Sequence, residues 1–506
     1  MSTKHTSSTI SLMSTRQIAT STIWQLASQI TMAALSILTV KFVAVGLSKE
    51  LAGNYNSAYG FLQLFGILAD FGLYAVAVRE VSRAPEANSV HGNLHKNTRE
   101  DVLGALIILR SFILVLSLGS ALLLVWLMPM WRGTPLPLGV TIASLVPFFT
   151  LLAGVIRTVF QVNYKMHYVF IAEVSQRILT VVLIGLFIFV GVRGSTDLQI
   201  YHLFLFIGGI GAFLLFLVSL FFGNRLMPIQ LHWNPDLIKK LARASAPFGI
   251  AFLCVALYRQ FDVTLIALLR PDFELQNAYY GFVLRMADVG FVIPTFLLNS
   301  TLPVLSERDA LGEDTRTLLG KTLLIILTLG TISFLFSALW SRPLVQLLTT
   351  SAYLSTPLHA GSDTALRLLS IPMFLNGIVM YGFYVLLTRM LWKRLVFILA
   401  AGSILSVGLN LWLIPLHGFV GAITVSIVIH TFLAFFLFRE GRRAMPFVIP
   451  KQGFVRWIFF SALLGFTLWL FVPFLHNEIV TILALGVAAV LLLLFAWGTG
   501  LVRCLL

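Results

Sequence analysis

Two neighbouring apolar stretches within 245–306, at 246–269 and 278–303, carry four charged residues, Arg259, Asp262, Arg285 and Asp288. A charge placed alone at the centre of a lipid bilayer costs roughly 2.5 to 3.5 kcal/mol even on lenient insertion scales, so charged residues in a span are expected to face protein or water. Ionisable groups inside spans commonly lie along the path of a solute or an ion. We therefore interpret these residues as the lining of a cavity that takes a charged solute.

The spacing of the four residues allows a structural alternative. Arg259 lies three residues before Asp262, and Arg285 lies three residues before Asp288. Residues with this spacing share one face of a continuous helix, where opposite charges partly neutralise each other. Pairing within each helix is therefore the alternative to a solute path.

Asp70 and Arg110 carry charge deep in the first half of the chain. They lie in different predicted spans and have no oppositely charged neighbour at helical spacing, so each needs a tertiary partner or water. We count both among the cavity candidates. Because of their depth, Asp70, Asp262 and Asp288 are also the candidates for coupling transport to protons or sodium ions.

Shallower embedded charges have a simpler interpretation. Lys41 and Arg157 lie near predicted span ends, where a long side chain can reach the aqueous boundary. Glu173 and Arg177 are four residues apart with the acid first, which is the favourable order for a pair on one helix. The ten embedded charges comprise six basic and four acidic residues. This cationic excess favours an anionic solute, and a guanidinium with paired donors suits a phosphate group.

The composition indicates that these stretches cross a membrane. Of 506 residues, 58% are hydrophobic and only 11% are charged, whereas about 25% of residues are charged in soluble domains. The mean hydropathy is +0.93. Apolar windows of the length that a transmembrane helix needs recur along the chain, which predicts an all-α polytopic membrane protein. We place about fourteen spans at 18–45, 54–78, 102–129, 137–160, 168–192, 199–222, 246–269, 278–303, 318–340, 364–388, 395–415, 418–438, 455–475 and 478–500.

Basic residues are unevenly distributed over the segments that join these spans. Most of the lysines and arginines outside the spans fall in every second joining segment, and few fall in the others. The positive-inside rule then predicts that both termini are cytoplasmic. The predicted location is the inner (cytoplasmic) membrane of the cell. The formal net charge of +15 fits this topology and contact with anionic membrane lipids. A nucleic-acid partner is not predicted, because it would need basic residues gathered on one folded surface.

Two short motifs recur in the second half of the chain. Tyr59-Gly60-Phe61 returns as Tyr280-Gly281-Phe282, and the Val-Pro-Phe-Phe motif at 146–149 resembles Ile-Pro-Met-Phe at 371–374. Each repeat holds an even number of spans, which predicts two six-helix bundles related by a pseudo-twofold axis along the membrane normal. The predicted domains are a cytoplasmic tail at 1–16, a first bundle at 17–222, a linker with an amphipathic helix at 223–245, a second bundle at 246–438, and two additional helices with a short tail at 439–506.

The loops contain none of the motifs that mark common enzyme classes. A phosphate-binding loop of the form Gly-x-x-x-x-Gly-Lys-Ser/Thr is absent, as are His-Glu-x-x-His and Gly-x-Ser-x-Gly. The histidines form no close cluster with carboxylates at the spacing of metal ligands. The sequence therefore predicts no catalytic residues, no metal and no cofactor, so that a proton, a sodium ion or the membrane potential is left to drive transport.

Several short motifs, in this order and spacing, resemble the lipid-linked oligosaccharide flippases of bacterial surface-polysaccharide synthesis, within the multidrug/oligosaccharidyl-lipid/polysaccharide exporter superfamily. They are Leu-Ala-Gly-Asn-Tyr at 51–55, Ala-Asp-Phe-Gly-Leu at 69–73, Val-Arg-Glu at 78–80, the stretch from Ala246-Pro247 to Asp262, Tyr-Tyr-Gly at 279–281, Pro-Val-Leu-Ser at 303–306, Asn-Leu-Trp-Leu-Ile-Pro at 410–415 and Gly-Phe-Val-Gly-Ala at 418–422.

The resemblance implies two bundles around a central cavity and alternating access. It implies an undecaprenyl-pyrophosphate-linked glycan as substrate, moved from the cytoplasmic to the periplasmic leaflet. Asp262 and Asp70-Phe71-Gly72 match family positions, and Arg259 fits the family's cationic cavity. The first span lacks the Arg-Asp pair expected of lipid II flippases, which favours an O-antigen or exopolysaccharide repeat unit. The expected partners are this lipid-linked glycan, membrane lipids and other proteins of polysaccharide assembly.

Three other functions stay open at this point. A multidrug or toxin antiporter has the same fold but prefers an acidic cavity for cationic drugs. A membrane glycan polymerase or glycosyltransferase needs a sizeable outer loop with catalytic residues, and the predicted outer loops are short. A scaffold of the polysaccharide machinery that transports nothing would tolerate loss of Arg259 and Arg285.

Overall fold

The computed structural model describes residues 24, 27–29, 31–70, 72–84, 98–229, 231, 233–310 and 312–505. The predicted tail at 1–16 and the beginning of the first span lie outside the described residues. The chain forms two compact units, Met1–Ala256 and Leu257–Leu506. The predicted domain limits and the pseudo-twofold relation stay predictions.

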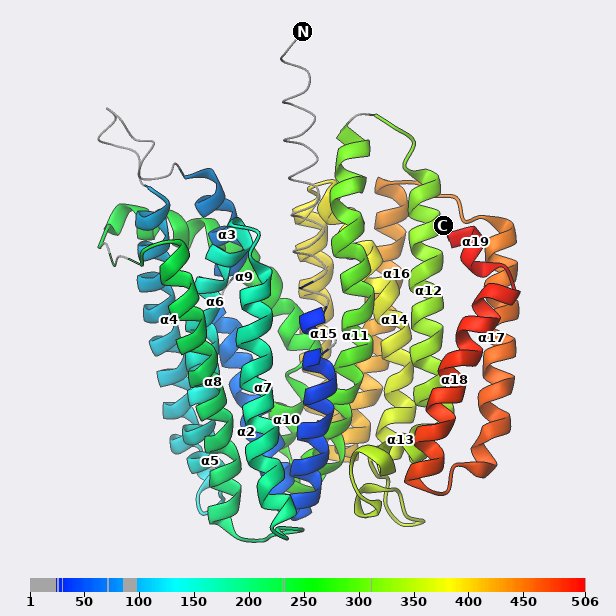
Figure 1. Cartoon of the computed structure of the whole chain (residues 1–506), viewed down its shortest axis with the longest axis horizontal. Coiled ribbons are helices and arrows are strands. Elements are labelled where there is room, and N and C mark those ends of the chain that lie inside the picture. Colours follow the sequence, from blue (N-terminus) through cyan, green and yellow to red (C-terminus); the bar gives the residue numbers. More distant parts are fainter. Residues whose placement is uncertain are drawn as a thin grey trace. The chain divides into compact units, whose positions relative to one another are not determined.

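The described residues are almost entirely helical, and Figure 1 shows long helices in both units. The predicted all-α membrane fold is confirmed. A helix at Ala27–Gly46 is followed by α2 (Lys49–Asp70), α3 (Leu73–Arg83), α4 (Arg99–Leu127), α5 (Leu136–Ala143), α6 (Leu145–Val162), α7 (Met166–Phe189), α8 (Leu198–Leu226), α9 (Pro235–Arg259), α10 (Asp262–Leu269), α11 (Phe273–Ala310), α12 (Arg316–Leu339), α13 (Ser341–Leu348), α14 (Ser362–Thr388), α15 (Trp392–His417), α16 (Phe419–Ala444), α17 (Lys451–Phe471), α18 (Glu478–Gly498) and α19 (Leu501–Leu505).

Within the described residues, eleven helices are long and apolar enough to cross a membrane, and the bent helix α9 makes up to twelve. The count of about fourteen therefore stays a prediction. The two predicted spans at 54–78 and 278–303 correspond to α2 with α3 and to α11. Polar residues such as Asn54, Asn56, Asn277 and Asp288 interrupt the apolar sequence of α2 and α11.

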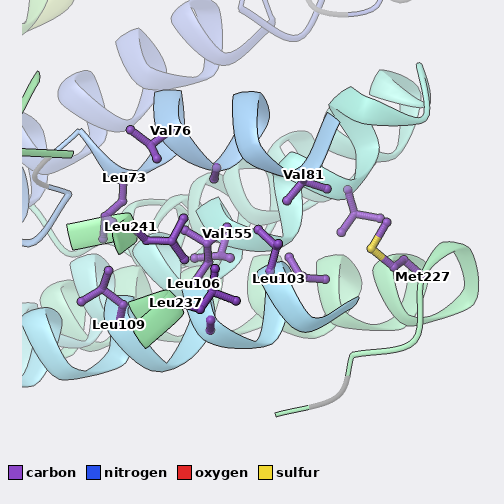
Figure 2. Close-up of a cluster of buried hydrophobic side chains, with 14 residues drawn as sticks. Leu73, Val76, Val81, Leu103, Leu106, Leu109, Val155, Met227, Leu237 and Leu241 are labelled. Atoms are coloured by element: carbon purple, nitrogen blue, oxygen red, sulfur yellow. The ribbon is translucent and has the colours of Figure 1, made fainter. Parts of the chain in front are cut away.

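Unit 1 contains a buried apolar cluster that joins its membrane helices to the beginning of α9. Figure 2 shows Leu73, Val81, Leu106 and Val155 of α3, α4 and α6 lying close to Leu237 of α9, and all five are buried. The cluster thereby joins α3, α4 and α6 to the beginning of α9.

In unit 2, α14 packs against α11, α12, α13, α15 and α16. The two C-terminal helices α17 and α18 lie beside α12 (Figure 1). Trp340 and Phe460 are fully buried between them, and the Trp340 indole nitrogen donates a hydrogen bond to the Leu468 carbonyl at 2.9 Å. Large apolar side chains on the outer faces of α17 and α18 are exposed, as expected for helices that face lipid.

Three interruptions of helices position the polar residues. The boundary between α2 and α3 lies at Gly72, whose φ of 69° favours glycine. A second break separates Arg259, the last residue of α9, from Asp262, the first residue of α10. A third lies at Gly418 between α15 and α16, where φ is 59° and an added Cβ would come within 2.2 Å of the Gln276 amide oxygen.

Candidate functional site

The second break places Arg259 next to a carboxylate that is distant in sequence. Its Nη2 lies 2.9 Å from Oδ1 of Asp288, which belongs to α11. The structure thus differs from the pairing of Arg259 with Asp262 that the spacing predicted. The prediction assumed one continuous helix, whereas the helix axis is interrupted between these two residues.

An aromatic platform lies beneath the Arg259 guanidinium. Its central carbon is 4.8 Å from the ring centroid of Phe291, which is a cation–π geometry. The imidazole of His430 stacks on the Phe291 ring, with the ring centroids 5.6 Å apart. The Tyr258 ring in turn lies edge-on to this imidazole, at a centroid distance of 5.7 Å. Asn376 donates a hydrogen bond to the Phe291 carbonyl at 3.0 Å, which holds this segment of α11 to α14.

The Arg259 guanidinium is only partly satisfied by these contacts. One nitrogen contacts Asp288, and the buried Nε has no hydrogen-bond partner among the described residues. The side chain of Arg259 is 18% exposed and that of Asp288 is 35% exposed. A cation that is oriented by an aromatic ring, paired once and partly open to solvent has donors left for an incoming anion.

Asp262 has a different environment. It is 8% exposed, accepts a hydrogen bond from the Tyr280 hydroxyl, and accepts another from the Val263 N–H at 2.9 Å. Asn277 donates to the Val263 carbonyl at 3.0 Å. These contacts fasten the first turn of α10 to α11, so this carboxylate anchors the broken span.

Arg285 lies in α11, less than one turn before Asp288, and is half-buried. The structure gives Asp288 a partner from another helix, Arg259. A role for Arg285 in a solute path stays a prediction.

In unit 1, Asp70 and Arg110 provide each other's tertiary partner. Nη1 of Arg110 lies 2.5 Å from Oδ1 of Asp70 and also donates to the Asp70 carbonyl at 3.0 Å. Its Nε donates to the Leu151 carbonyl at 3.3 Å, and the residue is 2% exposed. Carbonyls at the end of a helix lack intrahelical donors. Arg110 therefore caps the end of α2 just before the break at Gly72.

A small cavity of about 10 Å³ lies beside Arg110. Tyr74, Leu106 and Gly154 are among its lining residues. The volume is roughly that of one water molecule. The cavity therefore leaves no room for a glycan or a pyrophosphate.

A second polar group of unit 1 surrounds Glu173. Arg157 lies 2.8 Å from Oε1 of Glu173, and the Ser28 hydroxyl donates to Oε2 at 2.5 Å. Tyr74 donates to the Gln161 side chain, and the Arg157 guanidinium lies 5.9 Å from the Tyr74 ring centroid. The sequence predicted that Arg157 extends to the aqueous boundary and that Glu173 pairs with Arg177 on the same helix. In the structure, Arg157 of α6 pairs with Glu173 of α7.

The turn that follows α10 is fastened to the turn between α15 and α16. Arg270 contacts Asp272 at 2.7 Å and donates to the Pro415 carbonyl at 2.8 Å. Gln276 donates to Asp272 at 2.8 Å and accepts from the Phe419 N–H at 3.0 Å. Burial opposes ionisation of Asp272, but the hydrogen bonds from Arg270 and Gln276 and the charge of Arg270 outweigh it, so its pKa is lowered.

Sequence reasoning missed several members of the polar cluster in unit 2. Phe291 and Asn376 have no ionisable group that would draw attention, and His430 stands alone in its predicted span. Tyr280 stands in the repeated Tyr-Gly-Phe motif, which is the one sequence signal that could have led to it. Among the described residues, no group of three histidines, cysteines or acidic residues could hold a metal ion.

Comparison with solved structures shows a shared fold. "Lipid II flippase MurJ, inward closed conformation" has a TM-score of 0.70 and 13% identity, with 94% of this chain and 98% of that chain covered. An inward-facing multidrug resistance MATE family transporter of the MOP superfamily has a TM-score of 0.63 and 15% identity, with 84% and 98% covered.

A third similar structure, a MOP superfamily transporter from Pyrococcus furiosus, has a TM-score of 0.57 and 16% identity over 85% of this chain and 95% of that chain. It is described as having a binding pocket of reverse polarity that suggests a different function. No curated protein matches this chain in sequence.

The model of a sequence family described as "polysaccharide biosynthesis protein" matches residues 18–309, which is more than half of the 506 residues. This match confirms the family resemblance that the short motifs indicated. The chain belongs to the polysaccharide biosynthesis protein family.

Proposed function

We propose that this chain is a flippase that moves an undecaprenyl-pyrophosphate-linked oligosaccharide from the cytoplasmic to the periplasmic leaflet. The proposed substrate is an O-antigen or exopolysaccharide repeat unit, and the mechanism is alternating access. The observation that carries the proposal is the environment of the Arg259 side chain. It lies over the Phe291 ring, pairs with the single carboxylate of Asp288 and is partly exposed. Family membership and the fold shared with a lipid II flippase support it.

Arg259 is the proposed contact for the pyrophosphate. An anion that displaces Asp288 gains donors that are already oriented by the Phe291 ring, because a planar guanidinium forms paired hydrogen bonds to phosphate oxygens. Asp288 then limits how tightly the anion is held, since it competes for the same nitrogen. Such competition favours release, which a transporter needs as much as binding.

The membrane potential would assist the proposed transport. Moving two negative charges out of a cell with a negative interior gains about 4.6 kcal/mol per 100 mV. If a proton or a sodium ion is also coupled, Asp288 and Asp70 are better candidates than Asp262. Their side chains are 35% and 33% exposed and each is bound to one arginine, whereas Asp262 is buried against Tyr280.

The proposed location is the inner membrane with both termini in the cytoplasm, according to the distribution of basic residues. We propose no catalytic chemistry. The remaining proposed partners are membrane lipids and other proteins of polysaccharide assembly.

A multidrug antiporter is the second candidate, because a MATE family transporter shares the fold. An acidic pocket suits the cationic drugs that such antiporters export, whereas the exposed polar cluster here is centred on an arginine. Drug resistance that depends on this chain and on Asp262 would favour the antiporter.

The test is the location of the lipid-linked oligosaccharide in cells that lack this chain. We expect it to accumulate in the cytoplasmic leaflet and the surface glycan to disappear. Wild-type protein should restore both, and Arg259→Ala at equal abundance should not. Normal surface glycan without accumulation, or full restoration by Arg259→Ala, would contradict the proposal.

A further inference from the structure

Helix α8 is a candidate membrane span, and the basic segment that follows it is predicted to lie at the aqueous boundary of the membrane. Helix α8 ends at Leu226, and α9 is bent by 45° between its parts Pro235–Ala246 and Gly249–Arg259. Pro247 lies between these parts and has no backbone N–H to continue the helix. The first part therefore changes direction before the chain enters the span.

One face of Pro235–Ala246 is fixed to unit 1. Leu237 and Leu241 are buried in the apolar cluster that also contains Leu103, Leu106 and Val155 (Figure 2). The helix begins with a cap, because the Asn234 side chain accepts a hydrogen bond from the Leu237 N–H at 3.1 Å. This packing determines which face of the helix points outward.

The opposite face is cationic. Lys239, Lys240 and Arg243 are exposed and lie at helical spacing, so they form one patch. None of the three forms an ion pair with any residue that the structure describes, whereas Arg394 and Arg443 both contact Glu440. The single acid on this face, Asp236, stands in the first turn of the helix, where its charge is stabilised by the helix dipole.

Two large apolar side chains precede the helix and are not buried by the protein. Leu231 is 67% exposed and Trp233 is 71% exposed. Exposed tryptophan and leucine beside a basic helical face are typical of segments that lie in the membrane interface. A lysine or arginine near an anionic lipid surface contributes about a fivefold gain in binding.

We propose that Leu231, Trp233, Lys239, Lys240 and Arg243 form a docking surface for anionic phospholipid headgroups. We call these five residues the lipid strap. The apolar members enter the interface and the basic members bind the headgroups. The lipid strap thereby fixes the junction between α8 and α9 to the membrane, whatever solute the protein transports.

The test measures the binding of phosphatidylglycerol and phosphatidylcholine to the full-length purified protein by native mass spectrometry. Wild-type protein should retain phosphatidylglycerol at least about tenfold more tightly than phosphatidylcholine. The triple variant Lys239→Gln, Lys240→Gln, Arg243→Gln should lose most of this preference, and Trp233→Ala should weaken the retention of both lipids.

The matched control is Lys393→Gln, Arg439→Gln, Lys451→Gln. It removes the same charge from three exposed residues that belong to three different helices. Its preference for phosphatidylglycerol should stay within about twofold of wild type. If the triple strap variant fails to fold, two milder variants provide the same comparison. Lys240→Gln should reduce the preference for phosphatidylglycerol, and the charge-preserving variant Lys239→Arg, Lys240→Arg should retain it.

Two results would overturn the lipid strap. One is an unchanged phosphatidylglycerol preference in folded strap variants. The other is a strap that is required for binding inorganic pyrophosphate but not for the lipid preference, because the surface would then belong to the solute path. The first result leaves the proposed flippase function untouched, and the second would add these residues to the proposed solute path.

Discussion

Two of the embedded ion pairs, Asp70 with Arg110 and Arg259 with Asp288, contain the same chemical groups but differ in what surrounds them. Arg110 is 2% exposed and donates to backbone carbonyls on α2 and α6 as well as to a carboxylate. The side chains of the two acids are similarly exposed, 33% for Asp70 and 35% for Asp288, so the difference lies in the arginines. Arg259 is 18% exposed and contacts one carboxylate and one aromatic ring.

The difference indicates that a charge within a span has two distinct uses. Arg110 has become part of the helix framework, since its donors complete the end of a broken helix. Arg259 is held in place by Phe291 and Asp288 and can still exchange one partner for a ligand. Depth in the membrane alone therefore does not identify a solute-binding residue; the number of protein acceptors around it is the better guide.

The largest effect is expected at Arg110. Replacing it with methionine removes the donor to the Asp70 carboxylate and to the α2 carbonyls. Removing one partner of a fully buried pair costs about 3 to 5 kcal/mol, and we expect the lower end of this range because the Asp70 side chain is 33% exposed. We expect the yield of folded protein and its unfolding temperature in detergent to fall sharply. Arg259→Met is the matched control, with a loss near 1 kcal/mol. Equal stability of the two variants would remove the distinction between the pairs.

The second effect is functional. Arg259→Ala should reduce transport of the lipid-linked glycan by at least about tenfold, which corresponds to the loss of one charge-assisted contact, while the amount of protein in the membrane stays normal. Arg259→Lys should recover only part of the activity, because an ammonium lacks the planar fork of the guanidinium. If the Arg259→Ala variant transports the glycan at the wild-type rate in a quantitative export assay, Arg259 does not contact the substrate.

A smaller effect of opposite sign is expected at Asp288. Asp288→Asn removes the competing charge but keeps a side chain of the same shape. Because this pair is partly exposed and such pairs contribute little, about 1 kcal/mol or less, inorganic pyrophosphate should bind two- to fivefold more tightly in calorimetry. Asp70→Asn serves as the control and should leave binding unchanged. Weaker binding by Asp288→Asn would mean that Asp288 positions Arg259 and does not compete for it.

The smallest effect concerns an ion pair outside the predicted spans, Arg270 with Asp272. The pKa of Asp272 is lowered, so the stability that its carboxylate contributes is present above its ordinary pKa and is lost only as the pH falls through the lowered value. The side chain is 37% exposed, and exposed pairs contribute about 0 to 1 kcal/mol.

Unfolding of Asp272→Asn should therefore differ little from that of wild type, and the difference should be constant between pH 5 and pH 8. A difference that grows or vanishes within this range would show that another group titrates with Asp272.

The helices themselves were largely predictable from the sequence. Twelve of the fourteen predicted spans overlap helices that are long and apolar enough to cross a membrane, counting the bent helix α9. The remaining two predicted spans correspond to α2 with α3 and to α11. Both carry polar residues of the candidate site, so they are less apolar than the other spans.

The partners of the charged residues were not predictable in the same way. Spacing rules describe neighbours on one continuous helix, whereas Arg259 and Asp288 are brought together by the break after α9 and by the packing of α11. The need of Asp70 and Arg110 for tertiary partners followed from the sequence, but that each is the partner of the other depends on how α2 and α4 pack. Phe291 carries no charge, so only the structure reveals it beneath Arg259.

The most direct test of the central claim is transport by purified protein in liposomes. A fluorescent undecaprenyl-pyrophosphate-linked oligosaccharide is placed in the vesicles, and its appearance in the opposite leaflet is followed with an impermeant quencher. We predict rapid movement with wild-type protein, at least about tenfold slower movement with Arg259→Ala, and no effect of adding a cationic drug. Wild-type protein that moves the lipid no faster than empty vesicles do, or Arg259→Ala that matches wild type, would contradict the account.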